Sequence, residues 1–247
     1  MSSIGRVGFF HFGSDEKEDP VGALTSAIEK WFREQRSNPI GAIPELTDTL
    51  LVLPEGFNVL NGYYAPKPEL DANACFRLKA LSTTRGITFV VGLIEKLKGQ
   101  NSAYLIDGNT APQLLSRKRT IGAGTLDLYA PCQTFEEEAV LHRGIGITAL
   151  LCDDAGLSGE RRPELTKFRR LQCGSKVLCV PACMMNTDSL GRARRWADSI
   201  TVVMANGCRY CQSVIIHGDK TVVSTEYGAE NEIMLLDLSV PGKASCD

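Results

Sequence analysis

Residues 49–55 read Thr49-Leu50-Leu51-Val52-Leu53-Pro54-Glu55, an apolar run that stops at a proline and is followed by an acid. A continuous apolar run of this kind is typical of a strand buried on both faces, as in the parallel sheets of α/β proteins. Proline does not continue a central strand, so Glu55 lies just past the strand's end. The stretch therefore predicts a layered α/β fold with an acid at the edge of a sheet.

The flanking sequence repeats this alternation of strands and helices. Asp19-Pro20 is a favourable N-cap and first-turn pair, and the apolar spacing after it predicts a helix to about residue 36. A second helix is expected near 69–84, and Asp107-Gly108-Asn109 predicts a hairpin turn. Strands are expected at 5–12, 87–92, 103–106 and 113–116.

The second half of the chain continues the pattern. Residues 139–151 form one long apolar run that ends at Cys152, and helices are expected after Pro163 and over 188–198. Further strands are expected at 176–181, 200–204, 212–216, 220–224 and 232–238. The later strands follow one another closely enough to pair antiparallel, which would make the sheets mixed.

Composition narrows the class of protein. The 247 residues are 43% apolar and contain no linker-like stretch, so we expect one domain over 1–247. With 27 basic and 29 acidic side chains, the chain offers no general attraction to nucleic acid or acidic lipid. There is no membrane-spanning run and no secretory signal, and the nine cysteines cannot all pair within one chain. We therefore expect reduced thiols and a cytoplasmic location.

Three potentially reactive side chains each end or follow an apolar strand: Glu55, Lys118 and Cys152. A carboxylate can take the proton of a thiol, and an ammonium can stabilise both the thiolate and the oxyanion that forms when sulfur adds to a carbonyl. Taken singly, each also has a structural interpretation, as an exposed loop acid, part of a basic turn or a small buried hydrophobe.

The local sequence around these residues resembles that of the nitrilase, or carbon-nitrogen hydrolase, superfamily. Residues 51–55 look like its strand-Pro-Glu element, and Ser116-Arg117-Lys118 is similar to the end of its run into the catalytic lysine. Residues 146–154 look like the glycine-bearing strand that ends at the nucleophile, with an acid two positions later. Further similarity is found at residues 92–95, 101–107, 163–165, 192–197 and 202–206.

The resemblance implies a four-layer α-β-β-α sandwich with two mixed sheets and at least a homodimer. It implies Glu55 as general base, Lys118 as oxyanion partner and Cys152 as nucleophile, with the backbone N–H of Asp153 binding the substrate oxygen. It implies an amidase or nitrilase that acts on a small molecule, an amide before a nitrile, with no metal or organic cofactor.

Two features depart from the family's pattern. The segment 153–163 is longer than usual, and Asp153 stands where an aromatic side chain is frequent. A second structural glutamate has no clear counterpart, since Asp127 and each of Glu136, Glu137 and Glu138 are candidates. Distance along the chain favours Asp127, but the role stays unassigned.

Three other functions remain open at this point. The same thioester could pass its acyl group to an amine, or the chain could be an inactive relative that binds a ligand. A zinc or thiol-redox module could use Cys208 and Cys211, a single CxxC pair, perhaps with Cys173, Cys179 or Cys183. His11, His142 and His217 are interpreted as core or turn residues.

Overall fold

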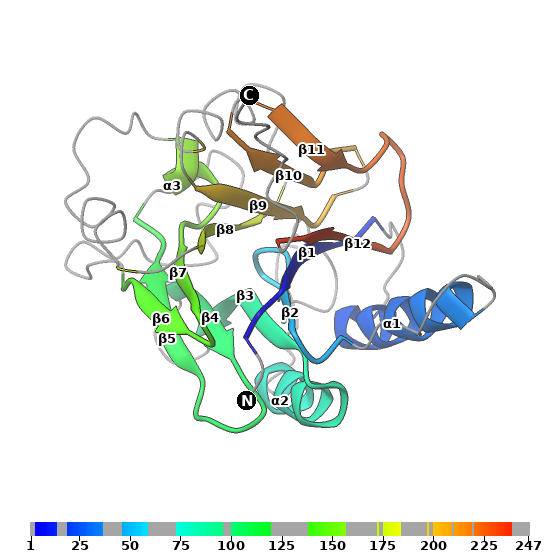
Figure 1. Ribbon diagram of the computed structural model, residues 1–247, viewed down its shortest axis with the longest axis horizontal. Coiled ribbons are helices and arrows are strands. Elements are labelled where there is room, and N and C mark those ends of the chain that lie inside the picture. Colours follow the sequence, from blue (N-terminus) through cyan, green and yellow to red (C-terminus); the bar gives the residue numbers. More distant parts are fainter. Residues whose placement is uncertain are drawn as a thin grey trace, which may run out of the picture.

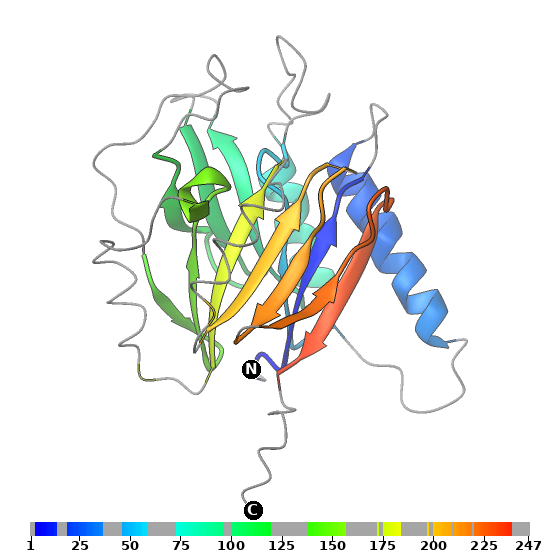
Figure 2. The same ribbon diagram turned by 90° about the horizontal axis from the view of Figure 1, so that it is seen from above.

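The structure is a computed structural model in which twelve segments of the chain are described. They are residues 3–13, 19–36, 46–58, 73–95, 100–119, 138–156, 172, 175–183, 197, 200–208, 210–218 and 220–238, with the backbone alone for Asp153 and Gly156. Within these residues the chain forms two six-stranded sheets that lie face to face (Figures 1 and 2).

The first sheet has the strand order β12-β1-β2-β3-β4-β5. Its centre is parallel and carries the apolar runs from which the fold was predicted: β1 (Arg6–His11), β2 (Thr49–Val52) and β3 (Thr88–Glu95). Antiparallel strands flank this centre, namely β4 (Gln100–Ile106), β5 (Gln113–Arg117) and β12 (Glu232–Asp237). The pairing of β1 with β12 brings the two ends of the chain into one sheet.

The second sheet has the order β11-β10-β9-β8-β7-β6. Its parallel centre is β7 (Ile145–Ala149), β8 (Ser175–Ala182) and β9 (Thr201–Asn206). The antiparallel strands are β6 (Val140–His142), β10 (Val214–His217) and β11 (Lys220–Ser224). Both sheets are thus mixed, as expected.

The apolar run at 139–151 is a hairpin and not one strand. Arg143 and Gly144 lie between β6 and β7 with φ of 45° and 86°. Positive φ at both central residues is the geometry of the tight hairpin turn that follows strand twist, and it is usually marked by Asn-Gly or Asp-Gly. Arginine in the first position hides that signal, which is why the sequence read as one element.

Helices α1 (Pro20–Arg36) and α2 (Ala74–Arg85) cover the outer face of the first sheet (Figures 1 and 2). The Asp19 carboxylate accepts the N–H groups of Val21 and Gly22 at 3.2 and 3.1 Å, which confirms the expected cap of α1. α2 ends at Gly86, whose φ of 70° suits a glycine.

The core fills two spaces in the described part of the sandwich. Val7, Leu50, Val90, Ile147 and Val203 are among the fully buried side chains between the sheets. A second apolar cluster joins the first sheet to α1 and α2. The helices expected after Pro163 and over 188–198 lie outside the described residues, apart from Ala197, which is buried against the second sheet.

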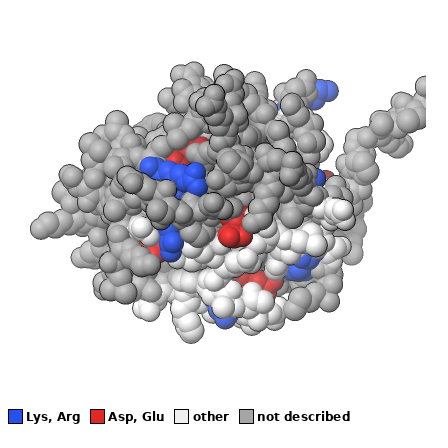
Figure 3. Space-filling model, turned by 90° about the vertical axis from the view of Figure 1, so that its left-hand side faces the viewer, with Lys and Arg blue, Asp and Glu red and all other residues white. Residues whose placement is uncertain are grey.

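Within the described segments, no helix combines the length and apolar character needed to cross a membrane. Figure 3 shows the face on the left of Figure 1, where the described basic and acidic side chains lie interspersed and form no surface of one sign.

Candidate active site

The two sheets are joined by backbone hydrogen bonds at the carboxyl ends of their parallel strands. Phe12 N–H, just after β1, donates to the carbonyl of Asn206 in β9 at 3.1 Å. Glu55 N–H, just after β2, donates to the carbonyl of Ala182 in β8 at 3.3 Å, and Gly207 N–H donates to the same carbonyl at 3.1 Å. The carboxyl ends of both sheets therefore meet, and the loops that follow them share one region.

A buried ion pair lies in this region. Lys118 Nζ is 2.6 Å from Glu55 Oε1, and the two side chains are 3% and 1% exposed. Asn101 Nδ2 donates to the same oxygen, also at 2.6 Å, and Asn101 is buried as well. Each charge offsets the cost of removing the other from water, and the amide supplies a further hydrogen bond.

Strand pairing explains why these residues meet. The Lys118 N–H donates to the Asn101 carbonyl at 2.8 Å, so Lys118 continues the antiparallel pairing of β5 with β4. Glu55 follows β2, which is separated from β4 by β3 alone. Gly92 in β3 makes this approach possible, since a Cβ there would lie 2.8 Å from Glu55 Cα and 3.0 Å from Leu151 Cδ2.

Cys152 stands on a sharp turn between β7 and the short helix α3 (Asp153–Gly156). Its φ is 43°, which is uncommon for a residue with a Cβ and typical of side chains held in a functional orientation. Its N–H donates to the Pro181 carbonyl at 2.9 Å, and its thiol donates to the Cys183 carbonyl at 3.3 Å. The carbonyl groups at the end of β8 thus bind both residues: those of Pro181 and Cys183 accept from Cys152, and that of Ala182 accepts from Glu55.

Cys183 and its neighbour hold two of these groups. The Cys183 carbonyl accepts the Cys152 thiol at 3.3 Å, and the preceding carbonyl, of Ala182, accepts the Glu55 N–H at 3.3 Å. Burial raises the pKa of the Cys183 thiol well above its usual value, Glu55, Cys152 and Cys208 raise it further, and Lys118 lowers it. Glu55 and Cys152 therefore meet at the carboxyl end of β8.

Asp154 ties the lysine loop to the cysteine turn. Its side chain is buried, and its Oδ2 accepts the Arg119 N–H at 2.9 Å. Arg119 follows Lys118, and Asp154 lies two residues after Cys152. This acid was noticed in the sequence as part of the motif, but its partner could not be named.

The remaining sequence candidates have different outcomes. Asp153 begins α3, and its side chain is not described. Asp127, Glu136 and Glu137 lie outside the described residues. Glu138 is exposed, and its N–H donates to the Leu115 carbonyl at 2.7 Å.

Asn101, which hydrogen-bonds Glu55, was missed as a site residue. Its signal is the pairing of β4 with β5, because Asn101 lies opposite Lys118. The register at the turn end of this hairpin, where Tyr104 lies opposite Leu114, would place Gln100 opposite Lys118, but the register shifts by one between Ala103 and Tyr104.

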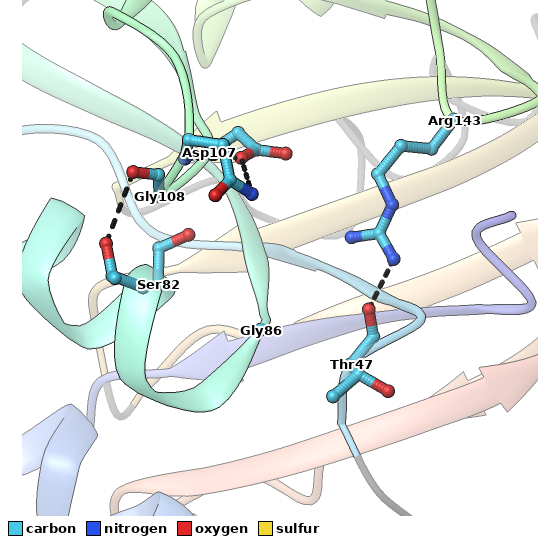
Figure 4. Close-up of a pocket in the computed structure, with 8 residues that line it drawn as sticks. Thr47, Ser82, Gly86, Asp107, Gly108 and Arg143 are labelled. Carbon is cyan, nitrogen blue, oxygen red and sulfur yellow. Dashed lines mark hydrogen bonds between the residues drawn. The ribbon is translucent and has the colours of Figure 1, made fainter. Parts of the chain in front are cut away.

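A hollow of about 150 Å³ lies at the opposite end of the strands (Figure 4). Thr47, Gly86 and Arg143 line it and precede β2, β3 and β7. Glu55 and Cys152 lie beyond the other ends of β2 and β7. The Arg143 guanidinium donates to the Thr47 carbonyl, and Asp107 pairs with His142 at 3.2 Å. None of its lining residues is a cysteine or lysine.

Among the described residues, no group of three or more His, Cys, Asp or Glu side chains is placed to hold a metal ion. Cys179, one of the ligands considered for zinc, lies in the core between the sheets.

Comparison with known proteins rests on the structure. No protein-family profile and no curated protein matches the sequence. A cysteine-to-serine mutant of an amidase from Nesterenkonia AN1, of the nitrilase superfamily, superposes with a TM-score of 0.65 at 17% identity, over 96% of this chain and 92% of that one. The fold is that of the nitrilase superfamily. The expected sandwich of two mixed sheets is thereby confirmed.

Two further structures of the Nesterenkonia amidase match similarly. A mutant in complex with butyramide gives a TM-score of 0.64 at 16% identity, with 96% and 92% of the two chains covered. A mutant whose active-site cysteine has added to acrylamide gives 0.65 at 17% identity, with 95% and 93% covered. At these identities the likeness concerns the fold.

Proposed function

We propose that this nitrilase-fold chain is an enzyme that hydrolyses the carbon-nitrogen bond of a small-molecule amide through a thioester on Cys152. The observation that carries the proposal is the buried Glu55–Lys118 pair at 2.6 Å, at the strand end that also holds Cys152 through Pro181 and Cys183. A buried ion pair is weak support for stability alone, so its place beside a nucleophile favours a chemical role.

In the first half-reaction the Glu55 carboxylate accepts the thiol proton, and the Cys152 sulfur adds to the amide carbon. The carbonyl oxygen becomes an oxyanion, which Lys118 Nζ stabilises. As the family resemblance implies, we assign the second oxyanion donor to the Asp153 N–H, at the start of α3 directly after Cys152. The proton on Glu55 passes to the leaving nitrogen, the carbon-nitrogen bond breaks, and ammonia or an amine departs.

In the second half-reaction Glu55 takes a proton from water, and the hydroxide oxygen adds to the thioester carbon. The carbon-sulfur bond breaks, the carboxylic acid forms and the thiolate recovers the proton. One carboxylate therefore serves both steps. Asn101 and Lys118 hold that carboxylate by Oε1 and fix its orientation.

The chemistry of the solved relatives suggests which substrates to try first. The Nesterenkonia amidase was captured with butyramide and with acrylamide, and its active-site cysteine took up the acetamide moiety of fluoroacetamide. Short aliphatic amides are therefore the first panel, and the substrate class we propose for this chain.

The test follows ammonia release from this panel and the intact mass of the protein. We expect ammonia and a covalent adduct with the wild type, and neither with Cys152→Ala. Cys75→Ala is the control, because Cys75 lies on α2 over the outer face of the first sheet, apart from the groups around Cys152, and is partly buried. Undiminished ammonia release by Cys152→Ala would refute the mechanism, while an adduct that maps to another cysteine would refute the assignment of the nucleophile.

A further inference from the structure

Three neighbouring parallel strands of the second sheet are each followed by a cysteine. Cys152 follows β7, Cys183 follows β8 and Cys208 follows β9, all at the same end of the sheet. Cys211 comes three residues after Cys208. The proposed hydrolysis uses the first of these thiols and leaves the CxxC pair without a role.

The turn that contains the pair brings the two cysteines into the range that a disulfide can span. Cys211 N–H donates to the Cys208 carbonyl at 3.0 Å, which closes a four-residue turn. The Cα atoms that end such a turn lie within about 7 Å of each other, and disulfides span roughly 4.4–6.8 Å. Both cysteines are partly exposed, and Tyr210 between them is 70% exposed, so a soluble oxidant can reach the turn.

The two thiols also interact with each other. A hydrogen bond with Cys208 raises the pKa of Cys211, and burial and the neighbouring Cys208, Cys183 and Cys152 add to the effect. The two thiols are therefore close enough to affect each other's titration, as the partners of a disulfide must be.

We propose that Cys208 and Cys211 are a reversible thiol-disulfide exchange site beside the nucleophile, oxidised by a small disulfide of the glutathione type. One of the two cysteines, as its thiolate, attacks oxidised glutathione, forms a mixed disulfide and releases one glutathione thiolate. The other cysteine then loses its proton and attacks the first sulfur, which breaks the mixed bond and releases the second glutathione. The two cysteines lose two electrons and two protons, and oxidised glutathione gains them.

A Cys208–Cys211 disulfide would change the surroundings of Cys152 through a short chain of hydrogen bonds. Gly207, next to Cys208, donates its N–H to the Ala182 carbonyl, and the carbonyl of the next residue, Cys183, accepts the Cys152 thiol. Asn206 anchors the other side of the loop, since its Nδ2 donates to the Gln212 carbonyl at 2.6 Å. Closing the sulfurs to about 2.05 Å within this anchored loop displaces Cys208 toward Cys211. We expect the change to slow alkylation of Cys152.

The full chain is equilibrated with mixtures of oxidised and reduced glutathione, quenched in acid, alkylated and digested with trypsin. Cleavage after Arg209 separates the two cysteines, so their disulfide joins two peptides and is unambiguous in the mass spectrum. We expect that linkage in the wild type, with the loss of two titratable thiols. Linkage of Cys208 to Cys152 or Cys183, or glutathione adducts with no Cys208–Cys211 linkage, would overturn the pairing.

Single variants test whether each thiol resolves the mixed disulfide of the other. Cys211→Ser is expected to accumulate glutathione on Cys208, and Cys208→Ser is expected to accumulate it on Cys211, because each lacks the second thiol. Cys75→Ser is the control and retains the disulfide. No glutathione adduct on the turn in either variant would contradict the exchange.

The final readout is the rate at which iodoacetate, which has no amide group, modifies Cys152, measured on the reduced and the oxidised protein. A slower rate after oxidation in the wild type, absent in Cys208→Ser, supports coupling to the nucleophile. Equal rates would refute the coupling. None of these readouts measures the hydrolysis of an amide, so their outcome is independent of whether the chain hydrolyses one.

Discussion

Removing one partner of the Glu55–Lys118 pair should destabilise the protein strongly, and removing both should cost less than the sum of the two single changes. At 2.6 Å the attraction between the two charges is roughly 6 kcal/mol with an effective dielectric constant of about 20. Most of that energy offsets the cost of burying the charges, so the loss of one partner leaves the other uncompensated. We expect Lys118→Met to lower the free energy of unfolding by about 3–5 kcal/mol.

The double variant Glu55→Gln with Lys118→Met removes both charges and keeps an acceptor for Asn101. We expect its cost to be less than the sum of the single costs, with a coupling energy of about 2–3 kcal/mol. The assay is urea unfolding of the four proteins, analysed at constant m-value.

The chain supplies a matched control. Lys30 and Glu34 lie on α1 at 4.0 Å, with 64% and 60% of their side chains exposed. Lys30→Met should cost no more than about 0.5 kcal/mol, because exposed pairs of this spacing contribute little. Additive costs at Glu55 and Lys118, or costs no larger than at Lys30, would refute the view that this pair is a buried, coupled unit.

Three further outcomes follow from single residues. Burial lowers the pKa of His11 from 6.5 to about 4, so the unfolded chain binds the proton more readily, and stability should fall by up to about 3 kcal/mol as pH drops from 6.5 to 4; urea unfolding across this range should show a flatter profile for His11→Gln. Gly92→Ala forces a methyl against the Glu55 backbone and should cost about 1–3 kcal/mol in thermal unfolding together with most of the activity, and a stable, fully active variant would contradict the packing described. Asp154→Ala removes the acceptor of the Arg119 N–H. It should raise the activation free energy of the reaction and lower the free energy of unfolding, by about 1–3 kcal/mol each, whereas Asp154→Asn keeps an oxygen there and should recover much of both kcat and stability.

The strands were predictable because burial on both faces leaves a plain mark in the sequence. The runs at 50–53 and 89–91 are short, apolar and bounded by turn signals, which favours strands of a covered sheet, and they fall on β2 and β3 at its centre. The hairpin at Arg143-Gly144 was missed because positive φ at an arginine has no sequence signature.

The residues of the proposed site could be selected from the sequence, but their contacts could not. Glu55, Lys118 and Cys152 could be selected because each ends or follows a strand and the local sequence around them resembles that of a known family. Asn101 could not be selected, because its contact with Glu55 depends on a one-residue register shift in the β4–β5 pairing. Side chains that meet across a sheet are fixed by pairing and packing, which local sequence does not encode.

The shared carbonyl of Ala182 has a consequence for the order in which the chain folds. Glu55 and Gly207 come from opposite halves of the sequence, and both donate to this one oxygen. Contacts between distant parts of a chain form late, because the entropy of closing the intervening loop has to be met first. During synthesis, the Glu55 N–H could bond the Ala182 carbonyl only after β8 has left the ribosome. An unfinished chain could therefore contain folded strands of the first sheet and still lack the arrangement of Glu55 beside Cys152.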